Sequence, residues 1–125
     1  MVPTPQFIHI TLYFSLVKVF FNGSIKDDTD FKLFTEPWIQ LCRDKQKFHF
    51  EFDMSNIGLI DPIYCYKMSS FISDIKKEKE NYLEKSIITN VDVITYGLLR
   101  IIFLIQSPVS PVIIQYNGDE ILINP

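Results

Sequence analysis

Apolar and polar side chains alternate along several short stretches of this chain, which is typical of strands with one buried face. The clearest case is the segment 47–53, KFHFEFD, in which Phe48, Phe50 and Phe52 alternate with polar residues. We therefore predict a central strand at 47–53 whose three phenylalanine side chains point into the core.

Other strands are predicted on both sides of this one. An apolar region near the N-terminus changes the phase of its alternation at Ser15–Leu16, and such a change requires a tight turn or a bulge between two strands. Asn117-Gly118 is a hairpin signal that would let the last segment pair with the strand before it. The predicted strands besides 47–53 are 7–14, 17–22, 82–89, 111–116 and 120–123.

Helical spacing of apolar residues predicts three helices. The helix 62–79 has the clearest start, because Asp61 can cap it and Pro62 has no backbone N–H that would be left unpaired. A helix from Thr35 to Asp44 is predicted with Thr35 as its N-cap, which puts Pro37 in the first turn, where proline is tolerated. A third helix follows Asp92 and ends before Ser107-Pro108. Its predicted apolar stripe consists of Ile94, Leu98, Ile101, Ile102 and Ile105.

The predicted order is β-β-α-β-α-β-α-β, which indicates an α/β fold with a mixed sheet and about three helices. At 125 residues we expect a single domain over 1–125, with its core at about 7–116 and 117–125 as a C-terminal hairpin or tail. Polar side chains on the outer phase of two strands predict a second sheet face that is only partly covered. These residues are His9, Thr11, Tyr13, His49 and Glu51.

Composition narrows the function classes. The net charge of −3 does not favour nucleic-acid binding, which needs a basic face against phosphates. No apolar run reaches the roughly 20 residues of a membrane helix, and the first residues, MVPTPQ, lack the features of a signal peptide. We therefore expect a cytoplasmic protein without membrane insertion. Cys42 and Cys65 have no motif partner and are expected to be reduced thiols in the core.

The chain resembles a STAS domain, the fold of bacterial anti-sigma-factor antagonists and of the C-terminal domains of sulfate transporters. The resemblance extends from about residue 17 to residue 105 and depends on FFNGSI, on FEFDMSNIGLID and on the strand, loop and helix of YLEKSIITNVDVITYGLLRIIFLI. It implies a regulatory module that binds a protein. Asp61 matches the family's aspartate, but Ile63 stands where switched antagonists have the phosphoacceptor serine, so we expect no phosphorylation switch there.

No catalytic set, metal site or cofactor is predicted. Asp53 ends a strand as the phosphoacceptor of receiver domains does, but no acidic pair ends the first strand to hold Mg²⁺, and loop capping is the expected role. His9, His49 and Glu51 offer at most three metal ligands, and only if the strands pair suitably.

Two functions are consistent with the sequence. The first is a protein-interaction module that binds a protein partner, or a second copy of the chain, through the loop 54–61 and the start of the helix 62–79. In this hypothesis Ile57 and Leu59 form an exposed patch beside Tyr66, and Ile60 packs under the helix. The full set of predicted contact residues is Ser55, Asn56, Ile57, Leu59, Asp61, Tyr64 and Tyr66.

The alternative is a small-ligand or nucleotide-binding protein, or a small enzyme, that uses Asp53, Asp61 and His49. A nucleotide would bind at the start of the helix that follows Asp61, where backbone N–H groups attract phosphate. This hypothesis requires the three side chains to converge on one pocket.

Overall fold

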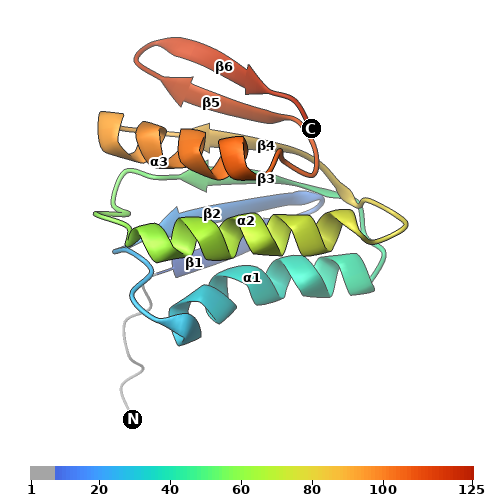
Figure 1. Ribbon diagram of the computed structural model, residues 1–125. Helices are drawn as coiled ribbons and strands as arrows, with labels where there is room; N and C mark the ends of the chain where they lie inside the picture. Colours follow the sequence, from blue (N-terminus) through green and yellow to red (C-terminus); the bar gives the residue numbers. More distant parts are fainter. Residues whose placement is uncertain (1–7) are drawn as a thin grey trace.

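The computed structural model describes residues 8–125, which form one six-stranded sheet and three helices (Figure 1). The α/β fold predicted from the sequence is confirmed. The predictions for MVPTPQ and for residue 7 lie outside the described residues. The elements are β1 (Ile8–Tyr13), β2 (Leu16–Phe21), α1 (Asp28–Arg43), β3 (Phe48–Asp53), α2 (Pro62–Lys76), β4 (Leu83–Thr89), α3 (Val93–Ile105), β5 (Val112–Tyr116) and β6 (Asp119–Ile123).

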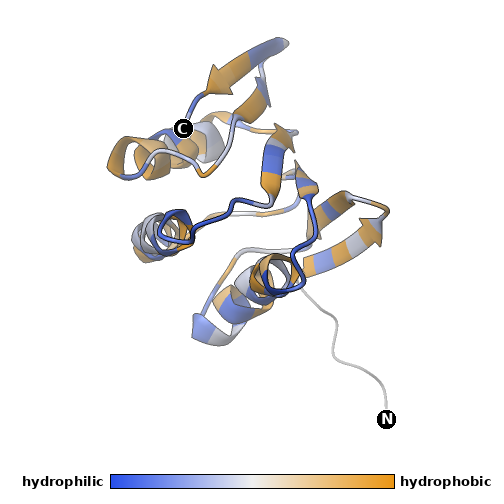
Figure 2. Ribbon diagram, turned by 90° about the vertical axis from the view of Figure 1, so that its right-hand side faces the viewer, coloured by the Kyte–Doolittle hydropathy of each residue, from blue (hydrophilic) through white to orange (hydrophobic). Residues whose placement is uncertain are grey.

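The strands lie in the sheet in the order in which they occur in the chain, β1-β2-β3-β4-β5-β6. The first and last pairs are antiparallel hairpins, and β2 to β5 run parallel to one another. Because each of the three helical crossovers moves one strand further in the same direction, right-handed connections put every helix on the same face. Figure 2 shows all three helices on one side of the sheet.

Within residues 8–125 no helix covers the other face of the sheet, which agrees with the polar phase of the strands. The strand registers place one residue from each strand in a row across this face, with polar members at the β1 end and apolar members at the β6 end. The row is Thr11, Lys18, Glu51, Ile87, Ile113 and Leu122.

The core lies between the sheet and the helices and is rich in aromatic residues. Phe48, Phe50 and Phe52 are all buried, which confirms the predicted direction of the central strand. The Trp38 ring on α1 packs edge-on against both Phe50 and Phe71, with centroid distances of 5.0 Å to each. These contacts fix α1 and α2 against the middle of the sheet.

The predicted start of the first helix at Thr35 is wrong, because α1 begins two turns earlier. Asp27 is the N-cap, and its carboxylate accepts a 2.8 Å hydrogen bond from the backbone N–H of Asp30. Thr35 is buried within the helix and its hydroxyl donates to the carbonyl of Phe31. Pro37 therefore lies in the helix interior, where it removes one backbone hydrogen bond that the aromatic packing of α1 compensates.

Only part of the predicted apolar stripe of the third helix faces the sheet. Ile102 packs against the core, whereas Ile94, Ile101 and Ile105 are about half exposed. The fully buried positions are Thr95 and Leu99, which the stripe did not include. The prediction failed because VITYGLLRIIFLI is apolar on every side, so spacing alone does not define the buried face.

Candidate functional site

The loop 54–61 crosses the edge of the sheet at which the parallel strands end. Backbone hydrogen bonds attach it to the segment that follows β2 and to the end of β4: Gly23 N–H donates to Asn56 O at 2.8 Å, and Met54 N–H donates to Thr89 O at 3.0 Å. Within the loop, Ile57 N–H donates to Met54 O at 3.3 Å. The loop therefore has a defined conformation and presents its side chains in fixed directions.

Ile57 is only 3 % exposed and belongs to the hydrophobic core, so the prediction that it forms a surface patch is wrong. The loop folds back over the end of the sheet, and the Ile57 side chain points from the loop into the core. Gly58 then reverses the chain with a φ of +70°, a conformation that favours glycine. Ile60 is partly buried against the core, as expected for a residue packed under the helix.

Three large apolar side chains remain on the surface of this segment. Leu59 is 74 % exposed, Ile63 52 % and Tyr66 62 %. We call these three residues the α2 apolar surface. Ile63 is not among the contact residues predicted from the sequence, which indicates only that it stands at the phosphoacceptor position. Because Ile63 lies three residues before Tyr66, both side chains are on one side of α2.

The remaining predicted contact residues divide into exposed and buried positions. Ser55, Asn56 and Asp61 are exposed. Tyr64 is buried, with its ring 5.9 Å from that of Phe31 on α1, so it packs against the core side of the helix.

Aspartate caps the N-terminus of each of the three helices. The carboxylates of Asp27, Asp61 and Asp92 accept hydrogen bonds from backbone N–H groups two or three residues further on. The N–H groups of the first turns are thus already paired with a fixed negative charge. Since a phosphate would have to displace that charge, these helix starts do not favour a nucleotide.

Asp53 serves the loop in the same way. Its carboxylate accepts 3.0 Å hydrogen bonds from the backbone N–H of Ser55 and from the side-chain amide of Asn90. These donors stabilise the charged form and lower the pKa of Asp53 below its usual value, the Ser55 N–H having the larger effect. The expected role in loop capping agrees with this geometry.

The three side chains of the enzyme hypothesis do not converge. His49 precedes Asp53 by four residues on β3, a separation of roughly 13 Å along a strand. Asp61 is turned back to the N–H of Ile63 as the cap of α2. The proposed metal ligands are also apart, because β2 lies between the strands of His9 and His49. His9 is level with Phe20 of β2, whereas His49 is level with Leu16, four residues away along the same strand. Among residues 8–125, no three histidine, cysteine or acidic side chains form a metal-binding group.

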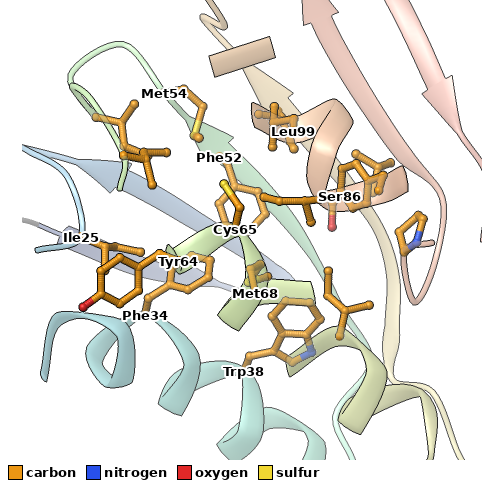
Figure 3. Close-up of a pocket in the computed structure, with 18 of the residues that line it drawn as sticks. Ile25, Phe34, Trp38, Phe52, Met54, Tyr64, Cys65, Met68, Ser86 and Leu99 are labelled. Atoms are coloured by element: carbon orange, nitrogen blue, oxygen red, sulfur yellow. The ribbon is translucent and has the colours of Figure 1, made fainter. Parts of the chain in front are cut away.

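An apolar cavity of about 120 Å³ lies between the sheet and the helices (Figure 3). Its walls include Phe52, Met68 and Leu99, and none of Asp53, Asp61 and His49 reaches it. Two of its lining residues, Trp38 and Ser110, are at most 5 % exposed, and within the described chain the indole N–H and the hydroxyl have no hydrogen-bond partner. This cavity could not be predicted from the sequence, because the residues around it come from seven helices and strands and from three loops.

Both cysteines are free thiols. Cys65 is buried beside the cavity and Cys42 is half-buried, and burial raises the pKa of both thiols above their usual value. A raised pKa leaves little reactive thiolate near neutral pH, which agrees with the expected structural role.

No family model, curated protein or solved structure matches the chain. Between residues 8 and 125, no helix combines the length and the apolar content that crossing a bilayer requires.

Proposed function

We propose that this protein is a non-catalytic interaction module that binds a protein partner through the α2 apolar surface. The observation that carries the proposal is the exposure of Leu59, Ile63 and Tyr66, each more than half open to solvent on one loop-and-helix segment. Clustered apolar side chains of this size mark interaction sites more often than isolated ones do, and tyrosine is enriched among the residues that dominate binding energy.

The segment is well prepared for binding. Its loop is hydrogen-bonded to the segment after β2 and to the end of β4, and the Asp61 cap fixes the start of α2. A partner would therefore bind a surface that is already ordered, and little conformational entropy would be lost. Asp61 and Asp92 are exposed at the same edge of the sheet, so a partner with basic residues around an apolar centre would be complementary in charge.

The resemblance to STAS domains supports the same class of function, a regulatory module that binds a protein. Ile63 has no oxygen that could accept a phosphate. We therefore propose that binding is not switched by phosphorylation at this position, and that Ile63 instead adds apolar contact area.

The test uses partners captured from the host with the intact chain as bait. Leu59→Asp and Tyr66→Asp are each expected to weaken partner binding by about 2 kcal/mol, close to 30-fold. Leu12→Asp is the matched control, because Leu12 is 58 % exposed on the edge strand β1, whereas α2 connects β3 and β4. Unchanged binding by both α2 variants, with native circular dichroism, would refute the proposal.

A second candidate function, the binding of a small apolar molecule, is favoured by the cavity beneath the helices. A buried indole N–H usually finds an acceptor, and Trp38 and Ser110 both lack one. A cavity of about 150 Å³ holds benzene, so an occupant here would be of that size or smaller and would bear one acceptor oxygen.

Trp38 is the one tryptophan of the chain, so its indole N–H gives a single NMR signal. Titration with 1-butanol should shift that signal saturably, and Leu99→Phe, which fills the cavity, should abolish the shift. A linear drift equal in both proteins would exclude a ligand site.

A further inference from the structure

The outward face of α3 is apolar along its whole length. Figure 2 shows this helix, beside the C-terminal end of the chain, as largely orange, whereas α1 and α2 carry more blue. The exposed side chains on this face are large, and Leu104 is 79 % open to solvent. The outward residues are Val93, Ile94, Gly97, Ile101, Leu104 and Ile105.

These six positions are arranged symmetrically about Leu99, the buried residue at the centre of the helix. Positions on any face of a helix are related in this way about the middle of the face, so the spacing alone is not informative. The residue types at the six positions are specific to this sequence. In an antiparallel pair of α3 helices centred on Leu99, each residue meets its counterpart on the other copy. Val93 lies opposite Ile105, Ile94 opposite Leu104, and Gly97 opposite Ile101.

Gly97 is the residue that the isolated chain does not explain. A Cβ built on it would meet nothing within 4 Å, so no neighbour in the chain requires the small residue. Glycine also weakens a helix interior relative to alanine. Opposite Ile101, however, it leaves a gap that takes a large side chain and lets two helix backbones approach closely.

The distribution of charge on α3 is consistent with an antiparallel pair of these helices. The face between Val93 and Ile105 carries no charged residue except Arg100 at its border, and the Arg100 guanidinium lies over the Tyr96 ring at 5.9 Å. In a pair centred on Leu99 the two copies of Arg100 would be about 3 Å apart along the helix axis, at the exposed border of the contact. The residues inside the contact are all uncharged. Antiparallel helices also place the positive end of one macrodipole beside the negative end of the other.

We propose that the outward face of α3 binds a second copy of this chain, as an antiparallel helix pair in which Ile101 of each copy fills the space over Gly97 of the other. The inference is independent of the proposed function, because it uses a different helix and different side chains. The occupant is a second copy because the pair places the open position of Gly97 opposite Ile101 of the other copy. The face also bears almost no charge for a polar partner to meet.

The first test is the oligomeric state by sedimentation equilibrium. The intact chain is expected to be a dimer, and Ile101→Asp is expected to raise the dissociation constant by about 30-fold or more. Gly97→Ala favours the helix itself but crowds the contact, so it should weaken the dimer by about 10-fold while the fold becomes no less stable. Leu12→Asp and Leu59→Asp should leave the dimer intact. A wild-type chain that stays monomeric up to about 1 mM would overturn the proposal.

The second test determines the register by disulfide formation, in a Cys42→Ser background. Mixed Val93→Cys and Ile105→Cys chains should cross-link. Val93→Cys alone should not, since two copies of residue 93 would be separated by about 18 Å along the helix axis. Cross-linking of Val93→Cys with itself would indicate a parallel pair and refute the proposed arrangement, as would the absence of any cross-link in the mixture.

Discussion

The side-chain amide of Asn90 donates a 3.0 Å hydrogen bond to the carboxylate of Asp53, and this bond joins the ends of two neighbouring parallel strands. The same carboxylate oxygen accepts from the backbone N–H of Ser55. Asn90 has a φ of +56°, in the left-handed region that asparagine tolerates better than most residues. An aspartate that looks catalytic by its position at the end of a strand therefore holds two loops together through its Oδ1.

Asp53→Ala is expected to lower the free energy of unfolding by about 1–2 kcal/mol, because two hydrogen bonds to a charged group are lost at a site that water partly reaches. Urea denaturation measures the change, and Asp119→Ala on the exposed end of β6 is the control. The structure should remain native by circular dichroism. Equal midpoints for the two variants would show that the carboxylate does not hold the loops.

Ile57→Asp and Leu59→Asp are expected to differ sharply although only Gly58 separates them. The first places a charge in the core and should lower the free energy of unfolding by more than about 3 kcal/mol, whereas the second should change it by less than about 0.5 kcal/mol. Guanidinium denaturation of both variants provides the comparison. Similar stabilities would mean that the loop does not insert Ile57 beneath it.

Phe50→Ala is expected to lower the free energy of unfolding by about 3–5 kcal/mol, since it opens a cavity beside Trp38 and Phe52 in the middle of the sheet. Phe20→Ala on the other face of β2 is a matched control with a smaller expected loss, because Phe20 is only half-buried. A denaturant midpoint equal to that of the wild type would show that Phe50 is not a core residue.

The strands could be predicted well because their pattern has only two phases. In β3 every second residue is phenylalanine, so one choice of face buries all three rings and the other exposes them. The same reasoning identified the uncovered face, and Asn117-Gly118 indicated the last hairpin, which the structure contains. The start of α2 was also predictable, because Asp61 and Pro62 are a local signal that needs no tertiary contact.

The helix faces and the loop were harder to predict because tertiary contacts decide them. In α3 the isoleucines at 94 and 101 are as apolar as the residues that face inward, and only docking on the sheet selects Leu99. In the loop, Ile57 and Leu59 have the same character, and the turn at Gly58 separates a buried side chain from an exposed one. The cap at Asp27 was not predicted, because Pro37 favours a helix that starts at Thr35.

The Asp92 cap of α3 leads to a prediction of how the stability of the fold changes at acidic pH. Asp92 accepts a 2.7 Å hydrogen bond from the backbone N–H of Thr95, which favours its charged form and lowers its pKa in the folded state. A lowered folded pKa means that the unfolded chain binds the proton more readily. The stability that the group contributes is therefore complete above the unfolded value of about 4 and is lost as the pH falls through the lowered value.

Asp92→Asn isolates this contribution, because asparagine caps a helix about as well as aspartate but does not titrate. At pH 7 the variant should unfold at a urea concentration slightly below that of the wild type, because it lacks the charge at the start of α3. The difference between the two proteins should narrow from about pH 5 to pH 3, while Asp28 and Asp53, whose pKa values are also lowered, leave both with residual acid sensitivity. A difference in unfolding free energy that stays constant over this range would mean that the Asp92 charge contributes nothing to the stability of α3.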